Sequence, residues 1–400
     1  DTCVGNDKPR PGRPMFDHPT LPSLADLAAA GIGDIEAVTQ PSPRPGNQHL
    51  PRLQPVLAGE KVRYVGDSVA FVAAESLAQA QDAAELIEVD YEILPAVIGC
   101  ATGTADDLSF AWEMGDGDAV TKAFAQAHHR TSLDLVNNRL VLAAIETRGA
   151  VAEYDPEAFG GRGKYPLTTT TQMPNPMRDQ LADQILKVER EQVRVLVHDV
   201  GGGFGGKNSM FPEYPLCLLA ARQLGRPVKW IGQRSDAFVT DFHGRDNVMK
   251  GEMAFDADGH LLAIRVASQA DMGAYIAGRG AISPVNGMIM LSNCYRIPHI
   301  HAQVWARYTN TVPTDPYRGA GRPEVLYMIE RLMDVAAAEM NIDRVELRRR
   351  NLIPPDDFPY ATPTGLNYDA CDFARVIDGA MANADWAGFA ERRREALSRG

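Results

Sequence analysis

The sequence predicts a mixed α+β fold in which a small α/β unit precedes a larger unit. Short segments rich in β-branched and apolar residues recur along the chain, as expected for strands, and longer stretches with apolar residues at helical spacing lie between some of them. With 400 residues and 45% hydrophobic content, the chain can bury a core shared by two or more domains.

The small unit is predicted over residues 21–101, after an irregular segment at 1–20 in a region rich in proline and glycine. The acidic, glycine-containing residues that follow it predict a linker over 102–129. The small unit is expected to combine three strands with one helix, in the order 61–65 (strand), 68–73 (strand), 76–87 (helix) and 88–92 (strand).

The larger unit is predicted over 130–400 and contains most of the secondary structure. Strands are expected at 148–154, 167–172, 193–199, 228–231, 248–255 and 262–270. Helices are expected at 177–189, 213–224 and 323–341, the last with a proline in its first turn.

Composition restricts the partners that the chain can have. A net charge of -12 without a dense run of lysine and arginine argues against nucleic acid and against an anionic membrane surface. The sequence has no apolar run of about twenty residues that would predict a membrane span. The five cysteines lie far apart, which argues against a disulfide framework and against a C-x2-C metal site. We therefore predict a cytoplasmic location and no metal-ligating residue.

Residues 193–207 are the most informative stretch, because a predicted buried strand leads straight into five glycines and one phenylalanine. Glycines accept positive φ and let consecutive backbone amides approach an anionic ligand closely. The spacing Gly201-x-Gly203-x-x-Gly206 matches the dinucleotide fingerprint, and the same stretch nearly completes a P-loop.

Both generic motifs lack their next required residue. The P-loop needs serine or threonine after the lysine to hold magnesium, whereas Asn208 follows Lys207. The dinucleotide motif needs an acidic residue after the next strand, and Gly232-Gln233-Arg234 follows the predicted strand 228–231. Because an arginine can serve the phosphate of NADP, an NAD(P)-binding Rossmann-type dehydrogenase stays open as an alternative.

Residues 317–324, Tyr-Arg-Gly-Ala-Gly-Arg-Pro-Glu, form a second glycine-rich stretch before a predicted helix. Amide groups together with a guanidinium suit a phosphate or an oxo-anion. The alternative is that Arg318 or Arg322 pairs with a carboxylate and only braces the loop.

As a set, these motifs resemble the large, molybdenum-cofactor subunit of the xanthine dehydrogenase, aldehyde oxidase and aerobic carbon monoxide dehydrogenase family. The resemblance extends over most of the chain. The motifs that carry it are at 61–66, 89–92, 146–149, 152–155, 171–174, 199–207, 225–230, 317–324 and 348–352.

The resemblance implies a hammerhead-like α/β domain over 21–101, followed over 130–400 by the first of two molybdopterin-binding domains. It implies molybdenum with molybdopterin, as such or as a dinucleotide, with Phe204 and Gly205 beside the oxo ligands of the metal and Arg318 close to the molybdenum. The cofactor-binding residues implied in this way are Gly202, Gly203, Phe204, Gly205, Gly206, Arg318 and Gly319.

In the family, water supplies the oxygen for hydroxylation and electrons leave through iron–sulfur centres to FAD or another acceptor. This chain has no cysteine spacing for a 2Fe-2S cluster and no convincing FAD site, so the resemblance implies an iron–sulfur subunit and an FAD subunit as partners. The catalytic glutamate of the family belongs to the second molybdopterin-binding domain. We expect this chain to be either a fragment or one half of a split large subunit, with the second domain on another chain in the latter case. We therefore assign no catalytic residue, and we expect Glu146, Glu213 and Glu324 to be structural acceptors.

Departures from the family concern the substrate pocket, to which we assign Asn208, Ala320 and Asn286. Purine-oxidising relatives carry a glutamate, an aromatic residue and an arginine at or near these positions, which argues against xanthine. Gly319-Ala320 provides no thiolate for the copper of carbon monoxide dehydrogenases. Residues 138–146 also lack the glutamine that we expected there beside the apical oxo group. We predict an aldehyde or a nitrogen heterocycle as substrate, with a non-catalytic homologue as the other alternative.

Overall fold

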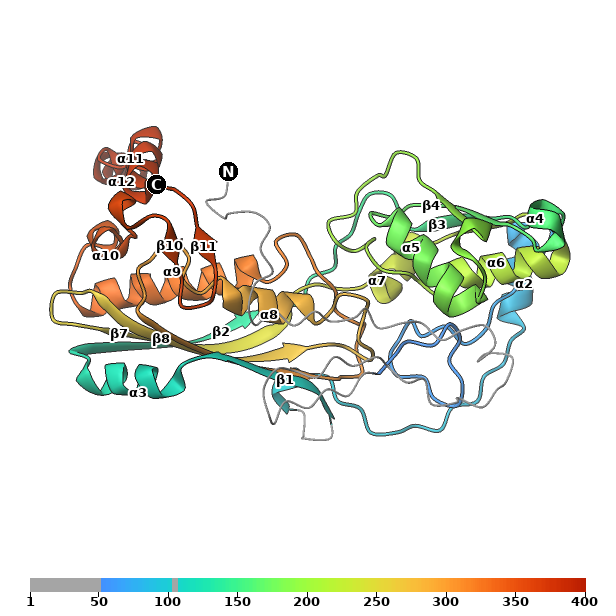
Figure 1. Cartoon of the computed structure of the whole chain (residues 1–400), viewed down its shortest axis with the longest axis horizontal. Helices are drawn as coiled ribbons and strands as arrows, with labels where there is room; N and C mark the ends of the chain where they lie inside the picture. Colours follow the sequence, from blue (N-terminus) through green and yellow to red (C-terminus); the bar gives the residue numbers. More distant parts are fainter. Residues whose placement is uncertain (1–51, 103–106) are drawn as a thin grey trace.

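The computed structural model describes residues 52–102 and 107–400, which form two main sheets with flanking helices (Figure 1) and one small two-stranded sheet, β10-β11 (Tyr360–Ala361 and Asn367–Tyr368). The predicted irregular segment 1–20 and the first part of the predicted small unit lie outside the described residues. The fold is α+β, which confirms the predicted fold class.

The larger sheet has five strands in the order β1-β9-β8-β7-β2. The pair β8 and β9 is parallel, and the other neighbours are antiparallel. The strands are β1 (Leu108–Gly115), β2 (His129–Asn137), β7 (Asn247–Phe255), β8 (Leu261–Asp271) and β9 (His299–Arg307).

Helices cover both faces of this sheet. In Figure 1, α9 (Arg322–Glu339) and α8 (Ile282–Ile289) lie on one face and α3 (Gly117–Gln126) lies on the other. α9 buries apolar residues at a spacing of three and four, among them Met328 and Leu332, so one stripe of the helix faces the sheet. A Cβ on Gly251 of β7 would lie 2.4 Å from the sulfur of Met328, so the glycine lets the helix pack closely against the strand.

The smaller sheet has four strands in the order β5-β4-β3-β6, of which only β4 and β5 are parallel. Its strands are β3 (Gly149–Ala152), β4 (Tyr165–Thr169), β5 (Val193–Leu196) and β6 (Val228–Ile231). α6 (Glu213–Leu224) packs on β3 and β6, and α5 (Pro174–Gln180) packs on β5.

A fully buried arginine ties the elements of the smaller sheet together. The Arg148 side chain is 2% exposed, and its Nη1 and Nε donate to Glu213 (2.7 Å) and Asp241 (2.6 Å). Its guanidinium also lies 3.7 Å from the ring centroid of Phe211 and 5.4 Å from that of Trp230. Burial opposes the charge, but the two carboxylates hold the pKa of Arg148 above its usual value. Arg148 therefore links the start of β3 to the start of α6 and the end of α7 (Arg234–Thr240).

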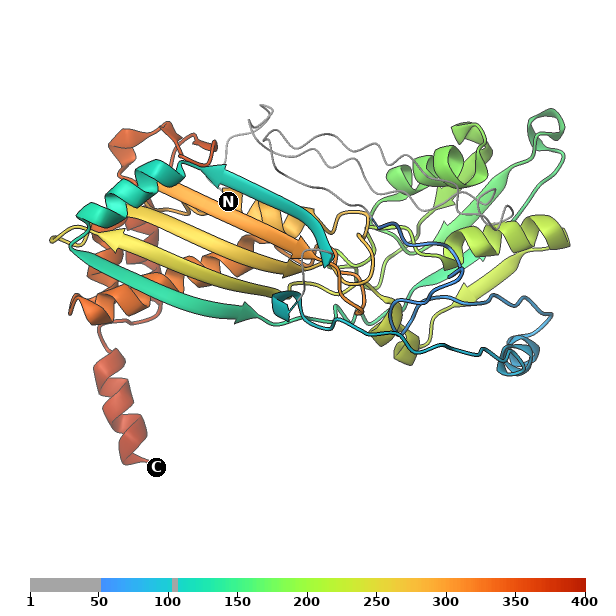
Figure 2. The ribbon, with the colours of Figure 1, turned by 90° about the horizontal axis from the view of Figure 1, so that it is seen from below.

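The described part of the small unit packs against the segments that connect the two sheets. Tyr64 lies in a small apolar cluster with Tyr275 and Val312. The hydroxyl of Tyr275 donates to Asp67 at 2.8 Å, and the amide of Val97 donates to the Asn310 side chain at 2.8 Å. Figure 2 shows its helix, α2 (Leu77–Glu85), beyond the smaller sheet, at the end of the molecule away from the larger sheet.

The remaining elements lie outside the two sheets. α12 buries no residue and projects away from the larger sheet (Figure 2). These elements are η1 (Cys100–Thr102), α4 (Ala158–Gly161), η3 (Leu181–Leu186), η4 (Arg190–Gln192), α10 (Arg344–Asn351), η5 (Pro355–Asp357), β10 (Tyr360–Ala361), β11 (Asn367–Tyr368), α11 (Phe373–Asn383) and α12 (Phe389–Ser398).

The nine elements predicted in the larger unit are all present. The six predicted strands are found as β3, β4, β5, β6, β7 and β8. Two predicted helices are found as α6 and α9, and the helix predicted at 177–189 is found as α5 followed by the π-helical turn η3. Lys187 ends this helix with a φ of 53°, two residues before the predicted end.

The strands predicted in the small unit are wrong. Residues 61–65, 68–73 and 88–92 form no strand in the described chain. Alternation of apolar and polar residues predicts an extended backbone, but a strand also requires a neighbouring backbone with which to pair. Among the described residues these segments make only isolated hydrogen bonds, such as Ala58 N to Ser68 O (2.6 Å) and Asn310 Nδ2 to Arg63 O (2.8 Å), and no ladder. Val65 is 80% exposed.

The linker predicted over 102–129 is also wrong in its structure. β1 pairs with β9 along its whole length, and α3 follows it directly on the face of β8 and β9. The alternation of Phe110, Trp112 and Met114 is the sequence signal that would have predicted the strand. Acidic residues and glycines at the ends of β1 obscured this pattern.

No helix in the described ranges combines the length and the apolar character needed to cross a bilayer.

We expect Arg148→Met to lower the free energy of unfolding by about 3–5 kcal/mol, because it leaves two carboxylates without their buried counterion. Urea unfolding followed by circular dichroism measures the change. Arg331→Met is the matched control, since Arg331 pairs with Asp334 at 3.2 Å on an exposed helix face. The control should change by less than about 1 kcal/mol, and equal losses in the two variants would contradict the central role of Arg148.

Candidate cofactor-binding site

Two glycine-rich loops meet between the two sheets. The first glycine loop (200–207) follows β5 of the smaller sheet, and the second glycine loop (316–321) leads into α9 on the larger sheet. At the contact, a Cβ on Gly205 would lie 1.9 Å from the backbone oxygen of Pro316, and Gly205 has a φ of 103°. Only glycine fits at this position, because the two backbones touch and the φ is one that other residues rarely adopt.

Two side-chain oxygens hold the first glycine loop. Oε2 of Glu146 accepts from the amide of Gly201 (2.7 Å) and from Nζ of Lys207 (2.8 Å). Oε1 of Gln172 accepts from the amides of Gly205 (2.9 Å) and Lys207 (3.3 Å). Burial disfavours the ionised form of Glu146, but its bonds from Lys207 and Gly201 hold its pKa below the usual value. The carboxylate is therefore charged when it holds the loop.

One arginine holds the second glycine loop. Nη1 of Arg245 lies 2.7 Å from Oε2 of Glu324 in an ion pair that is almost buried. Nη2 of Arg245 donates to the backbone oxygen of Arg318 at 3.0 Å. Its guanidinium also lies 4.8 Å from the ring centroid of Tyr317. Arg245 therefore fixes the backbone of residue 318 while the side chain of Arg318 stays exposed.

A buried hydrogen bond joins the segments next to the two loops. Oγ of Ser209 donates to Oδ2 of Asp315 at 2.7 Å, and the amide of Arg279 donates to Oδ1 at 3.0 Å. Burial raises the pKa of Asp315 to about 7. This carboxyl group changes its charge near neutral pH at a point where both loops are anchored.

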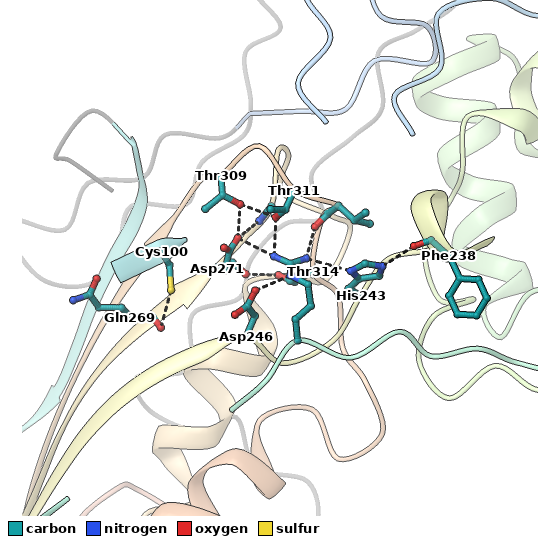
Figure 3. Close-up of polar contacts among 12 residues, drawn as sticks. Cys100, Phe238, His243, Asp246, Gln269, Asp271, Thr309, Thr311 and Thr314 are labelled. Atoms are coloured by element: carbon teal, nitrogen blue, oxygen red, sulfur yellow. Dashed lines mark hydrogen bonds and ion pairs between the residues drawn. The ribbon is translucent and has the colours of Figure 1, made fainter. Parts of the chain in front are cut away.

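A polar network joins the start of β7 and the end of β8 to the chain segment that leads into the second glycine loop (Figure 3). Arg139 donates to Asp246 (2.6 Å) and to Oγ1 of Thr311 (2.8 Å), and it lies 3.1 Å from Oδ1 of Asp271. The hydroxyl of Thr314 donates to the backbone oxygen of Asp271 at 2.7 Å. The chain that leads into the second loop is thereby held to the end of β8.

The loops leave several donors unused. No described residue accepts a hydrogen bond from the amides of Gly202, Gly203 and Phe204. The side chain of Arg318 forms no ion pair within the described ranges. Phe204 has a φ of 52° and is 44% exposed. Three neighbouring amides and one exposed cation suit an oxygen-rich anion.

The other residues singled out from the sequence lie on the two loops, directly after the first loop, or on α8. Gly206 is buried, and Gly319 is exposed with a φ of 96°. Ala320 lies in the second glycine loop with a φ of 46°, and Asn208 follows the first glycine loop and is partly exposed. Asn286 is buried in α8, and the next residue of that helix contacts the backbone of the second loop.

The alternative, in which Arg318 or Arg322 pairs with a carboxylate and braces its loop, is not found among the described residues. Arg322 donates weakly to the backbone oxygen of Gly319 at 3.4 Å, and neither arginine is ion-paired in the part of the chain that the structure describes. Arg245 has this role instead. It lies some seventy residues from the loop in sequence, and nothing in the surrounding residues indicated the contact.

Each of the three glutamates expected as structural acceptors lies against a cation. Glu146 accepts from Lys207, Glu213 accepts from Arg148, and Glu324 forms an ion pair with Arg245. Each carboxylate neutralises a cation that is largely or fully buried.

A glutamine from outside 138–146 contacts the first glycine loop. Gln172, three residues after β4 and within the motif 171–174, accepts hydrogen bonds from the loop through its side chain. Its position follows from the pairing of β4 with β5, which brings residues 172 and 205 together.

The geometry also contradicts the Rossmann alternative. A dinucleotide fingerprint requires the glycine turn to open a helix, so that the phosphates lie at the helix N-terminus. Here the glycines end at Gly206 and the next helix, α6, begins at Glu213. The unused amides therefore belong to a loop that does not form the N-terminus of a helix.

Comparisons with known proteins agree with this arrangement. The model of the molybdopterin cofactor-binding domain matches residues 102–352, which is more than half of the chain. The chain belongs to the molybdopterin-binding large-subunit family. The model of the aldehyde oxidase and xanthine dehydrogenase a/b hammerhead domain matches residues 30–95.

Several relatives are similar to this chain along most of its length. The carbon monoxide dehydrogenase large chain of Hydrogenophaga pseudoflava is 33% identical over an alignment 409 residues long, gaps included. The alignment covers 94% of this chain and 50% of that protein. The nicotine 6-hydroxylase large subunit of Paenarthrobacter nicotinovorans is 31% identical, with 86% and 43% covered. The structure of quinoline 2-oxidoreductase from Pseudomonas putida 86 matches with a TM-score of 0.81 and 33% identity, covering 87% of this chain and 45% of that one. The chain thus spans about half the length of these relatives.

We expect Gly205→Ala to separate the two glycine loops, because its Cβ would overlap Pro316 O and its φ of 103° would be strained. The loss in the free energy of unfolding should exceed about 2 kcal/mol. Gly225→Ala is the control, since Gly225 also has positive φ (60°) but nothing lies within 4 Å of its Cβ position. Urea unfolding compares the two, and a loss no larger than that of the control would show that the loops do not touch.

We expect Asp315→Asn to become more stable relative to wild type as the pH rises from about 4 to about 7. The folded pKa of Asp315 is raised from 3.8 to about 7, so the folded state binds this proton more tightly than the unfolded state. The stability due to the proton is complete below the unfolded pKa and is lost as the pH rises through this window. Asparagine does not titrate, so it escapes this loss. Thermal unfolding of both proteins at several pH values measures the difference, which should stay constant above pH 7 and should not vary at all if Asp315 titrates normally.

Proposed function

We propose that this chain is the part of a molybdenum hydroxylase large subunit that holds molybdenum with molybdopterin between its two glycine loops. Family membership and the unused donors of the loops support this assignment. The small, hammerhead-like unit would end near residue 101, and the cofactor-binding unit would include residues 102–129, since β1 belongs to the larger sheet.

The residues of the two loops fit such a group. The amides of Gly202, Gly203 and Phe204 would donate to anionic or oxo oxygens, and Gly205 would let the backbone of the second loop approach. Arg318, with Gly319, would bring one cation to the same place. These donors hold oxygen atoms without offering a competing thiolate or imidazole to the metal. Gly206 would keep the end of the loop close to Leu142, from which a Cβ would be 2.6 Å away.

When bound, the cofactor supplies a two-electron oxidation in which water provides the oxygen atom. The chain's own contribution is to bind and orient it. We infer that Asn208, Ala320 and Asn286 shape the substrate pocket, since Asn208 and Ala320 lie on the two loops and Asn286 lies on the helix that contacts the second. Their small or neutral side chains favour an aldehyde or a nitrogen heterocycle over a charged substrate.

The relatives support the nitrogen heterocycle among these substrates. The names of two of them refer to nicotine and quinoline, both of which contain a nitrogen ring. One relative is named a carbon monoxide dehydrogenase. Carbon monoxide is still a poorer candidate substrate for this chain, because the second loop has Gly319-Ala320 and no cysteine. An iron–sulfur subunit, an FAD subunit and a second molybdopterin-binding domain would complete the enzyme. The alternative of a non-catalytic homologue predicts the same partners without the metal.

We expect Arg318→Ala to lower the molybdenum content of the purified complex at least about tenfold, because it removes the exposed cation of the site. Elemental analysis of molybdenum and iron per chain measures this, with wild type as the reference. Arg331→Ala is the matched control, since Arg331 is an arginine on the exposed side of α9, the helix that follows the second loop. Unchanged molybdenum in Arg318→Ala would remove Arg318 from the site, and a wild-type complex without molybdenum would favour the non-catalytic homologue.

A further inference from the structure

The contacts of Glu146 bridge the two ends of the first glycine loop. Its Oε2 accepts from the amide of Gly201, where the glycines begin, and from the ammonium of Lys207, which follows the last glycine. From this geometry we propose that Glu146 is a positioning residue, which closes the loop so that the amides of residues 202–204 remain free for an anionic ligand. The identity of that ligand rests on the function proposed above, but the closure of the loop does not.

The start of the loop is fixed against Glu146 by more than one contact. The amide of Glu146 donates back to the oxygen of Gly201 at 3.1 Å, so the two backbones exchange hydrogen bonds through the main chain and the carboxylate. A Cβ on Gly201 would lie 2.5 Å from the Cβ of Glu146. Glycine at position 201 is therefore required by the approach of Glu146.

The end of the loop is fixed through Lys207. Its backbone is held at the end of β4, where its oxygen accepts from the amide of Gln172 (2.9 Å) and the hydroxyl of Thr171 (3.0 Å). Its side chain is only 4% exposed and runs back to Glu146, where the ammonium lies 2.8 Å from Oε2. A buried ammonium without this carboxylate would be costly, so the side chain has one strongly favoured position.

With both ends held, the intervening residues can turn their amides outward. Gly206 N donates to Gly203 O at 2.8 Å, which tightens the turn, while the amides of residues 202–204 have no acceptor among the described residues. A loop that is ordered before the ligand arrives loses less conformational entropy on binding. The charge of Glu146 is compensated by Lys207, so an anion near the loop meets little repulsion from it.

Hydrogen exchange of the full chain tests this proposal without the cofactor. In Glu146→Ala, exchange of the Gly201 amide should accelerate at least about tenfold, while amides of β7 and β8 keep their wild-type rates. Glu146→Gln should restore most of the Gly201 protection, since its amide oxygen can still accept, but it should leave the segment near Lys207 less protected. Lys207→Met should loosen the end of the loop and leave Gly201 protected.

Glu252→Gln is the matched control, because Glu252 forms a similar ion pair with Arg265 at 2.6 Å between β7 and β8. It should not alter exchange in the first glycine loop. Wild-type exchange in Glu146→Ala, or equal exchange in the Ala and Gln variants, would overturn the positioning role. If Glu146→Ala does not fold, the difference between Glu146→Gln and Lys207→Met decides, and identical profiles reject the proposal.

Molybdenum content of the complex separates this inference from the proposed function. If wild type holds molybdenum, Glu146→Ala should lose it several-fold faster on dialysis, and Glu146→Gln should be intermediate. Equal rates of loss in all three would overturn the link between loop closure and retention. A wild-type complex without molybdenum would contradict the proposed function, while the exchange data would still decide whether Glu146 closes the loop.

Discussion

The site depends on one contact, at which the backbone of Gly205 meets that of Pro316. Each loop belongs to a different sheet, so this contact also fixes how the two sheets are placed. The buried hydrogen bond between Ser209 and Asp315 makes a second connection between the segments next to the two loops. Because backbone atoms and buried side chains are involved, a shift of one loop would displace the other. The donors contributed by the two loops therefore act as one site.

Charges near the site are arranged in buried or half-buried pairs. Glu146 with Lys207, Glu213 with Arg148 and Glu324 with Arg245 each combine a carboxylate with a cation. Breaking such a pair leaves an uncompensated charge away from water, which explains why each pair can hold a loop or a helix in one place. The side chain of Arg318, on the second loop, is exposed and has no ion pair among the described residues, so no neighbouring carboxylate compensates its charge.

The sequence predicted the features that depend on composition within one segment. Apolar periodicity identified β7, β8, α6 and α9, because these elements are buried along most of their length. The glycine loops were recognised because close backbone approach requires glycine. Features that depend on distant segments were missed: Gln172 and Arg245 act on loops thirty to seventy residues away. β1 was missed for another reason, because acidic residues and glycines at its ends obscured its local alternation. In the small unit, alternation of apolar and polar residues predicted strands that are absent, because the described chain supplies no neighbouring backbone for them to pair with.

The chain as a whole carries a net charge of -12, yet the site is suited to anions. These facts are compatible because exposed charges farther away than about 8–10 Å are largely screened at physiological ionic strength. The potential at the first loop is then set mainly by nearby groups. Among them, Lys207 compensates the charge of Glu146 at 2.8 Å. Loss of that lysine would leave an uncompensated carboxylate beside the first loop, so the pairing maintains the electrostatics of the loop as well as its shape.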